Sequence, residues 1–194
     1  MIVEKVGLRG PRIALEPLGE EHLPGLARVI EDGALWEIPV TVVPHPRDLP
    51  GFLHDAEVQM AAQKELAFAT VDLASKAVVG STRFRNIDAA SRRVEIGFTF
   101  IAGSWQRTHV NTEAKYLMLR HAFEVWGTNR VELLTDVLNV KSRNAIERIG
   151  AREEGVLRAH MIMRGGRVRD SVIYSIIAPE WPGIKAALER KIGL

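Results

Sequence analysis

Residues 93–114 read RVEIGFTFIAGSWQRTHVNTEA, and this stretch decides which fold the chain adopts. Its first part is apolar and β-branched, which predicts a strand over Arg92–Ile101. After a polar loop, apolar residues at helical spacing predict a helix over Asn111–Trp126, with Asn111 as its N-cap and Gly127 as its end. A loop that leads into a helix exposes free backbone N–H groups at the positive end of the helix dipole. Such a terminus suits an anion, for example a pyrophosphate.

The neighbouring segments extend this unit into a sheet. Two further strands are predicted upstream, over Leu66–Leu73 and Ala77–Asn86, and short turns connect them to each other and to the strand at Arg92–Ile101. Such short turns make antiparallel neighbours. Downstream of the helix, Arg130–Asp136 is again β-branched and apolar, so a strand–helix–strand crossover with a parallel strand pair is expected.

The remaining elements complete an α/β (α+β) protein with a mixed central sheet of about seven strands and helices on both faces. No repeat, low-complexity tract or linker divides the chain, so one domain over residues 1–194 is predicted. These elements are a strand over 12–15, helices over 20–31, 49–63, 139–149 and from Pro179 toward Lys191, and strands over 155–164 and 167–177 that meet at the Gly165–Gly166 turn.

Composition narrows the class of protein. Of the 194 residues, 46% are hydrophobic and 26% are charged, which is typical of a globular protein and excludes a disordered one. No apolar run is long enough to span a membrane, and no signal peptide is recognisable, so a cytoplasmic protein is predicted. The absence of cysteine excludes disulfides and a thiol nucleophile. Few aromatic residues and no basic run argue against nucleic-acid binding.

Charge is unevenly distributed along the chain. Glu16–Glu65 holds ten acidic and three basic residues, whereas Lys141–Arg169 holds eight basic and three acidic residues. The two segments form either two solvated faces of opposite sign or a basic site for an anionic ligand beside an acidic approach for a cationic one. The sequence leaves both interpretations open.

Several motifs together resemble the GNAT acetyltransferases. The loop Gln106-x-x-His109-x-Asn111 stands where that family has the pyrophosphate loop Gln/Arg-x-x-Gly-x-Gly/Ala, and the order of elements matches the GNAT fold. NTEAK at 111–115, Asn139-x-x-Ser142 and GVLR at 155–158 resemble the branch that contains the ribosomal-protein N-terminal acetyltransferases. The resemblance covers roughly residues 8–181. The loop differs at His109, where the family has Gly, which is favoured for positive φ and for close approach to phosphate.

The resemblance implies an acetyl-CoA-dependent N-acetyltransferase, in which a primary amine attacks the thioester directly in a ternary complex. The acceptor would be a protein N-terminus or a small cationic amine; no metal is implied, and a homodimer is left open. The alternative is a non-catalytic acyl-CoA-binding sensor or a protein-interaction module on the same fold. The residues that the resemblance implies for the cofactor are Phe100, Ile101, Gln106, Arg107, Thr108, His109, Val110, Asn111, Thr112, Asn139, Ser142 and Arg143.

The resemblance implies two catalytic residues, Glu95 and Ser142. Glu95 matches the general base of many family members, and strand alternation directs it away from Ile96, to the face of Gly97 and Thr99. Its structural alternative is a sheet-surface ion pair with Arg83 or Arg92.

Ser142 would reprotonate the departing thiolate beside Asn139; alternatively, Asn139 only caps the helix and Ser142 lies in its first turn. Trp36, Glu95 and His160 are the expected acceptor-site residues.

Overall fold

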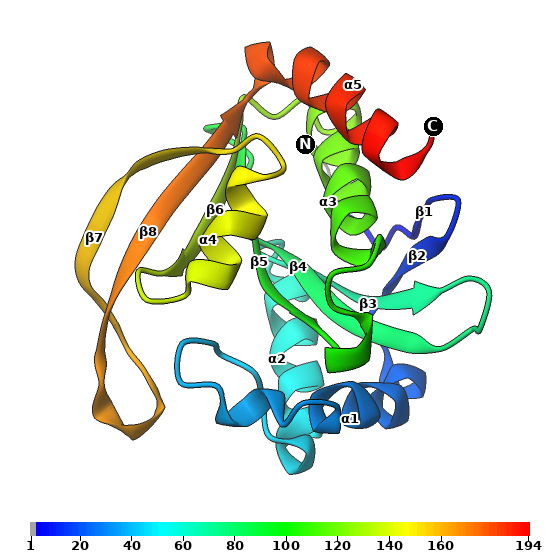
Figure 1. Cartoon of the computed structure of the whole chain (residues 1–194), viewed down its shortest axis with the longest axis vertical. Helices are drawn as coiled ribbons and strands as arrows, with labels where there is room; N and C mark the ends of the chain where they lie inside the picture. Colours follow the sequence, from blue (N-terminus) through cyan, green and yellow to red (C-terminus); the bar gives the residue numbers. More distant parts are fainter. Residues whose placement is uncertain (1–2) are drawn as a thin grey trace.

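The computed structural model describes residues 3–194, which form one mixed sheet of eight strands in the order β1-β2-β3-β4-β5-β6-β8-β7 (Figure 1). The strands span Leu8–Arg9 (β1), Ile13–Pro17 (β2), Leu66–Asp72 (β3), Val78–Asp88 (β4), Arg93–Ile101 (β5), Arg130–Asp136 (β6), Arg152–Ile162 (β7) and Val168–Ile177 (β8). The helices span Leu23–Glu31 (α1), Leu49–Ala61 (α2), Val110–Arg120 (α3), Val140–Glu147 (α4) and Trp181–Ile192 (α5). Within this described part of the chain, every helix is too short or too polar to cross a bilayer.

The mixed α/β fold predicted from the sequence is confirmed, with an additional strand at one edge. β1 has only two residues, too few for a periodic pattern, and it pairs antiparallel with β2. The long helix predicted over Asn111–Trp126 instead begins at Val110, so Asn111 lies inside α3 and is not its N-cap. That helix gives way to a π-helical turn at His121–Val125, and Gly127, at φ +61°, ends the segment as predicted.

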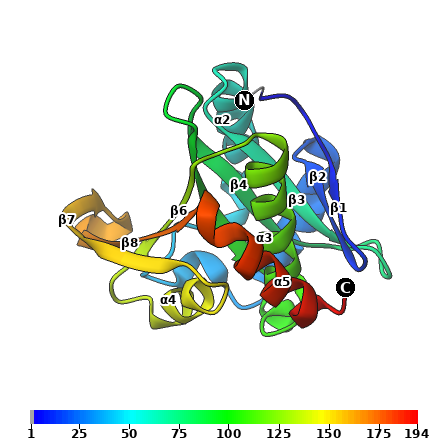
Figure 2. The ribbon, with the colours of Figure 1, turned by 90° about the horizontal axis from the view of Figure 1, so that it is seen from above.

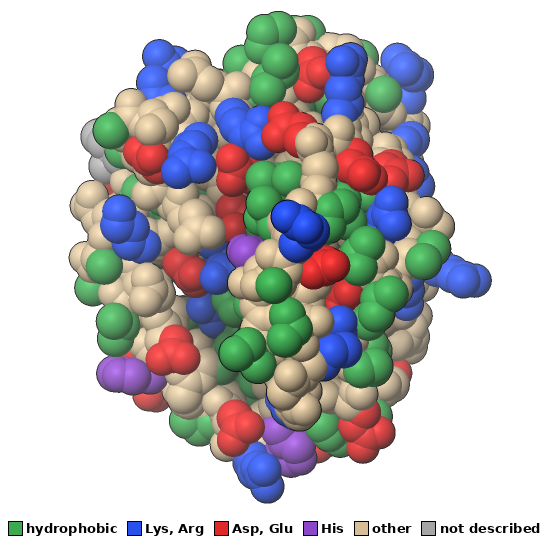
Figure 3. Space-filling model, turned by 90° about the vertical axis from the view of Figure 1, so that its left-hand side faces the viewer, with side chains coloured by type: hydrophobic (Ala, Val, Ile, Leu, Met, Phe, Trp, Pro, Cys, Tyr) green, Lys and Arg blue, Asp and Glu red, His purple; other side chains and the backbone are tan. Residues whose placement is uncertain are grey.

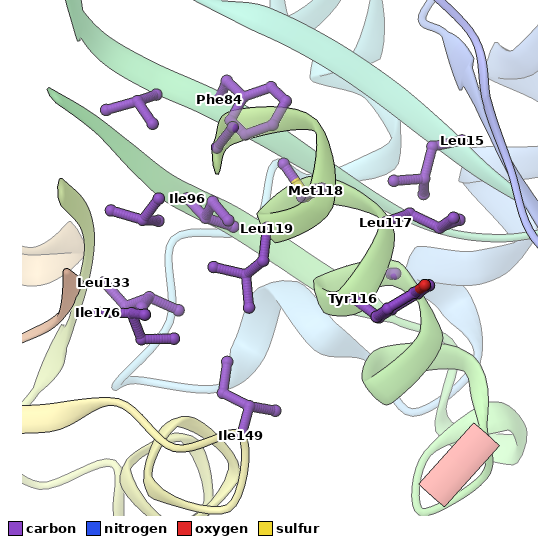
Figure 4. Close-up of a cluster of buried hydrophobic side chains, with 14 of the residues drawn as sticks. Leu15, Phe84, Ile96, Tyr116, Leu117, Met118, Leu119, Leu133, Ile149 and Ile176 are labelled. Carbon is purple, nitrogen blue, oxygen red and sulfur yellow. The ribbon is translucent and has the colours of Figure 1, made fainter. Parts of the chain in front are cut away.

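Helices cover both faces of the sheet, and each face has its own apolar core (Figure 2). On one face, α3, α4 and α5 pack against the strands. Leu117 of α3, Phe84 of β4 and Leu133 of β6 are buried between them (Figure 4). On the other face, Phe52 of α2 and Phe100 of β5 lie in the core formed with α1. Burial of these two apolar layers holds the central strands rigidly between the helices.

The parallel pair β5–β6 decides where the site lies. The two strands are paired only from Arg93–Glu95 to Arg130–Glu132, although β5 continues to Ile101 and β6 to Asp136. Beyond the paired residues, the edges of β5 and β6 that face each other have no partner strand. This separation opens the sheet in its middle and leaves backbone polar groups available to a ligand.

Candidate functional site

A cavity of about 500 Å³ lies between the separated ends of β5 and β6. It is walled by Ile96–Ile101 of β5, Leu133–Thr135 of β6 and residues of the loop at 35–43. It brings together many of the side chains predicted from the sequence: Glu95, Phe100, Ile101, Gln106, Asn111, Asn139, Ser142 and His160. On the side of β7 and β8 the surface is hollowed, and acidic, basic and histidine side chains meet there (Figure 3). The cavity therefore joins segments from nearly the whole chain.

One end of the cavity is an anion-ready loop before α3. The backbone N–H groups of residues 107–109, 111 and 112 have no acceptor among the described residues. Arg107 is exposed in this loop at φ +62°, and Lys141 donates a hydrogen bond to Gln106. Free amides at a helix start together with two basic side chains fit a pyrophosphate. The side chains of Val110 and Thr112 are buried beneath this loop, so only their backbone faces a ligand.

His109 differs from its prediction in backbone conformation. Its φ is −66°, an ordinary right-handed value, so the position does not need the positive φ that favours glycine. The left-handed residue of the loop is Arg107 instead. The His109 ring packs edge-on against Trp105. The imidazole thus turns toward the protein, and its buried Nε2 has no partner among the described residues.

Glu95 is a buried carboxylate at the other end of the cavity. Burial raises the pKa of this carboxyl, while the charge of Arg85 and a hydrogen bond from Asn86 oppose the rise. Asn86 Nδ2 donates to it at 2.6 Å and Arg85 at 3.4 Å, so the predicted pairing with Arg83 or Arg92 is wrong. A Cβ at Gly97 would lie 2.7 Å from a carboxylate oxygen of Glu95, so glycine at this position leaves room for the carboxylate where it stands. A buried carboxylate with a raised pKa suits proton abstraction.

Because β5 contains a bulge, the side chains after it face the opposite way from the prediction. Phe98 has φ +46°, and the pairing of β4 with β5 shifts register opposite this residue. Beyond the bulge, the Thr99 side chain does not share the face of Glu95. It points toward α3, where Lys115 donates a hydrogen bond to it, and it also hydrogen-bonds Thr82 of β4. The Phe98 ring instead lies against Arg85, whose guanidinium carbon is 4.1 Å from the ring centre. One extra residue in a strand reverses the alternation that follows it.

Asn139 and Ser142 hold the first turn of α4 against the cavity. The Asn139 side chain accepts a hydrogen bond from the Ser142 backbone N–H at 3.0 Å, which confirms the predicted N-cap. This cap uses the backbone N–H of Ser142, and the side-chain hydroxyl of Ser142 has no partner among the described residues. Both residues line the cavity. The hydroxyl is therefore free to act on a ligand there.

Arg107, Thr108, His109, Val110 and Thr112 of the loop before α3 are not part of the cavity wall, and outside this loop two further predicted side chains do not reach it. Arg143 donates to the Tyr174 hydroxyl at 3.1 Å and to Glu153 at 3.2 Å, on the far side of α4. The Trp36 ring packs against His45 at 5.2 Å between centroids, while other residues of its loop form the wall of the cavity. The predicted roles of Arg143 in binding cofactor and of Trp36 in binding acceptor therefore have no support in the geometry.

Lys115 of α3 lines the cavity but has no counterpart among the sequence predictions. Its ammonium donates to Thr99 at 2.7 Å and to Thr82 at 3.4 Å, and no carboxylate pairs with it in the described chain. Burial lowers the pKa of this lysine to about 7. The sequence holds one signal for it: no acidic residue stands three or four positions away to form a helical ion pair.

Comparisons with known proteins agree with this geometry. Residues 12–152 match the family described as acetyltransferase (GNAT) domain. A Bacillus subtilis (strain 168) protein named "Putative ribosomal N-acetyltransferase YdaF" is 37% identical over 106 residues, which cover 55% of this chain and 57% of that protein.

Two solved structures extend the likeness over nearly the whole chain. A GCN5-related N-acetyltransferase from Brucella melitensis is 29% identical, with a TM-score of 0.84 over 97% of this chain and 86% of that one. Mycobacterium smegmatis RimJ in complex with CoA-disulfide is 21% identical, with a TM-score of 0.83 over 97% and 95% of the two chains, and shares the fold.

No cluster of three or more potential metal ligands occurs in residues 3–194.

Proposed function

Because the chain belongs to the acetyltransferase (GNAT) domain family, we propose that it transfers an acetyl group from acetyl-CoA to a primary amine, most suitably a protein N-terminus. One observation carries the proposal: a single cavity joins the anion-ready loop before α3 to the buried carboxylate of Glu95. The name of the Bacillus subtilis relative, a ribosomal N-acetyltransferase, supports an amine of the ribosome as the acceptor. The predicted small cationic acceptor has less support, since none of the acidic residues of segment 16–65 lines the cavity.

Acetyl-CoA supplies the thioester, and the protein supplies position and protons. The loop amides with Arg107 and Lys141 would hold the pyrophosphate, and the cavity walls would hold the pantetheine arm. Asn139 would support that arm beside Ser142. The unpaired edge of β5 offers N–H groups to the thioester carbonyl as negative charge develops on it.

Glu95 and Ser142 each carry one of the proton transfers that the reaction needs. Glu95 accepts one proton from the ammonium, directly or through water, and the free amine then attacks the carbonyl carbon; the second proton leaves the nitrogen to solvent as the amide forms. As the carbon–sulfur bond breaks, the Ser142 hydroxyl donates a proton to the sulfur and regains one from solvent. No acyl-enzyme is required, since the chain has no cysteine to carry one. The direct ternary-complex mechanism and the cytoplasmic location remain predictions from the sequence.

The function is tested by CoA release from acetyl-CoA, measured over peptides with different first residues and over small amines. We expect turnover with peptide N-termini and slower or no turnover with polyamines. Binding of CoA without turnover of any amine would instead favour the non-catalytic acyl-CoA-binding alternative. A third outcome, with neither binding nor turnover, would return the chain to the protein-interaction alternative.

CoA is expected to stabilise the folded protein. At about one hundred times its dissociation constant, a ligand that binds only the folded state adds about 2.7 kcal/mol, or roughly 5 to 10 °C in melting temperature for this size. Arg107→Gln should need more CoA for the same shift, whereas Arg148→Gln, an exposed arginine outside the cavity, should not. Thermal melts over a CoA series measure both effects. A parent protein whose melting temperature ignores millimolar CoA contradicts the proposal.

Ser142→Ala is expected to lower kcat about a hundredfold, the lower end of what a general acid contributes, because water in an open cavity can replace the hydroxyl in part. Dissociation of CoA should stay near the parental value, since the α4 cap uses the backbone of Ser142. Steady-state CoA release and equilibrium binding separate these effects. An unchanged kcat would leave Ser142 with only its place in the first turn.

A further inference from the structure

Arg169 of β8 is a buried cation at the cavity, and no carboxylate of the described residues forms an ion pair with it. Its side chain belongs to the cavity wall, and the residue is only 7% exposed. Its Nε donates to the Ser171 hydroxyl at 2.8 Å, and no described residue accepts a hydrogen bond from its two terminal NH₂ groups. A guanidinium carries five N–H donors, and the four on the terminal nitrogens of Arg169 are not buried away from the cavity, so a ligand there can accept them.

Ser171 holds this guanidinium in place. The same hydroxyl lies 2.9 Å from His160 Nδ1 on β7. Because Ser171 accepts from Arg169, its own proton can point to His160, which leaves Nδ1 as the acceptor in that arrangement. Arg169 therefore sits on a fixed support between two strands of the hairpin, with its free NH₂ groups next to the cavity.

The other arginines around the cavity form ion pairs with carboxylates, whereas Arg169 does not. Arg83 and Arg85 are matched by two carboxylates, Glu65 and Glu95. On the other side, Asp136 forms an ion pair with Arg167 and accepts a hydrogen bond from the backbone N–H of Leu138, and it forms no ion pair with Arg169.

Among all described residues that line the cavity, Glu95 is the single carboxylate, against Arg85, Lys115, Lys141 and Arg169. Arg169 forms no hydrogen bond with the described residues of the phosphate loop, and it lines the same cavity as the proposed base, Glu95. Lys141, by contrast, contacts Gln106 of the phosphate loop. A free, planar donor in the same cavity as the base matches a carboxylate carried by the acceptor, because guanidinium and carboxylate pair through two parallel hydrogen bonds.

We propose that Arg169 forms a carboxylate subsite for the acceptor, so that the preferred substrate is a primary amine with a carboxylate close to it. This rests on the proposed function. The carboxylate has two sources, an acidic side chain at the start of a peptide or the α-carboxylate of a free amino acid. Either would occupy the NH₂ groups of Arg169 while its amine lies near Glu95.

The test compares acceptors that differ by one charge. The acceptors are peptides beginning Ser-Asp or Ser-Asn, and free serine or serinamide. We expect the parent to favour the carboxylate member of one pair at least tenfold in kcat/KM. Arg169→Gln should reduce that ratio to near one and leave kcat/KM for the amide member within threefold. Arg158→Gln removes an exposed arginine from neighbouring β7 and should keep the preference. The pair that shows the effect identifies the source of the carboxylate.

A second measurement does not depend on turnover. N-acetylated Ser-Asp and Ser-Asn peptides, and N-acetylserine with its amide, are titrated calorimetrically into the protein loaded with CoA. Tighter binding of a carboxylate form that is lost in Arg169→Gln supports the subsite even if no amine is acetylated, and then only the proposed function fails. Equal affinities and equal rates for both members of each pair, or a preference that persists in Arg169→Gln, would overturn the subsite while peptide turnover still supports the function.

Discussion

Glu95→Gln is expected to acetylate an N-terminal peptide about 10² to 10⁴ times more slowly than the parent at pH 7, the range for loss of a general base. The substitution keeps an oxygen that can accept the hydrogen bond of Asn86, so the fold should persist. The amide cannot take the proton of the ammonium. The loss should therefore appear in kcat, with binding of CoA near the parental value.

The pH dependence separates this role from a structural one. Burial raises the pKa of Glu95, so the parental rate rises with pH as the carboxyl loses its proton and then levels off. In the variant, only amine that is already deprotonated in solution can react. Since a free α-amino group has a pKa of about 7.7 to 8.0, raising the pH from 6 to 9 should partly restore the variant's rate.

The matched control is Glu132→Gln. Glu132 stands opposite Glu95 in the β5–β6 register, but it pairs with Arg130 and Arg93 outside the cavity. This variant should retain the parental rate at pH 7, and its pH profile should move only to lower pH, because the charge of Glu132 contributes to the raised pKa of Glu95. If Glu95→Gln also retained the parental rate, Glu95 would be a structural partner of Arg85, and the base would lie elsewhere.

Lys115→Met is expected to make the protein more stable below pH 7, with a gain that disappears as the pH rises. The pKa of Lys115 is about 7 in the folded protein and about 10.4 in an unfolded chain. Below pH 7 the lysine is charged in both states, and the folded state carries the whole cost of burying the charge. That cost is on the order of 5 kcal/mol for this difference in pKa.

The sign of the slope follows from proton binding. Between pH 7 and about 10, the unfolded chain holds a proton at Lys115 that the folded protein lacks, so the parent's free energy of unfolding rises with pH. The slope is up to about 1.4 kcal/mol per pH unit. Lys115→Met removes this contribution, and Thr82 and Thr99 still hydrogen-bond each other at 2.7 Å.

Urea unfolding at a series of pH values measures the difference between the two proteins. Lys64→Met removes an exposed lysine and should follow the parent at every pH. Parallel curves for the parent and Lys115→Met would show that Lys115 stays charged in the folded protein, with a neutralising group or solvent beside it.

The sequence by itself determined the elements and their order, because these depend on neighbours along the chain. Alternation and turn residues identify the strands, and the residues before α3 identify the anion-ready loop. The Asn139 cap was predictable for the same reason, since it contacts a backbone N–H only three residues away. Even here, the start of α3 was misplaced by one residue, because the backbone N–H of Glu113 donates to the carbonyl of His109, so Val110 already belongs to the helix.

The tertiary structure alone decided which charges are buried and which pairs they form. The bulge at Phe98 turns Thr99 toward α3, and only this places Thr99 against the ammonium of Lys115. Glu95 lies beside Arg85 because strand register brings β4 and β5 together, not because of sequence spacing. Arg169 reads as a solvated residue of a basic hairpin strand, yet it is buried where β5 and β6 separate. Desolvation of a charge depends on everything packed around it, and segments distant in the sequence supply those neighbours.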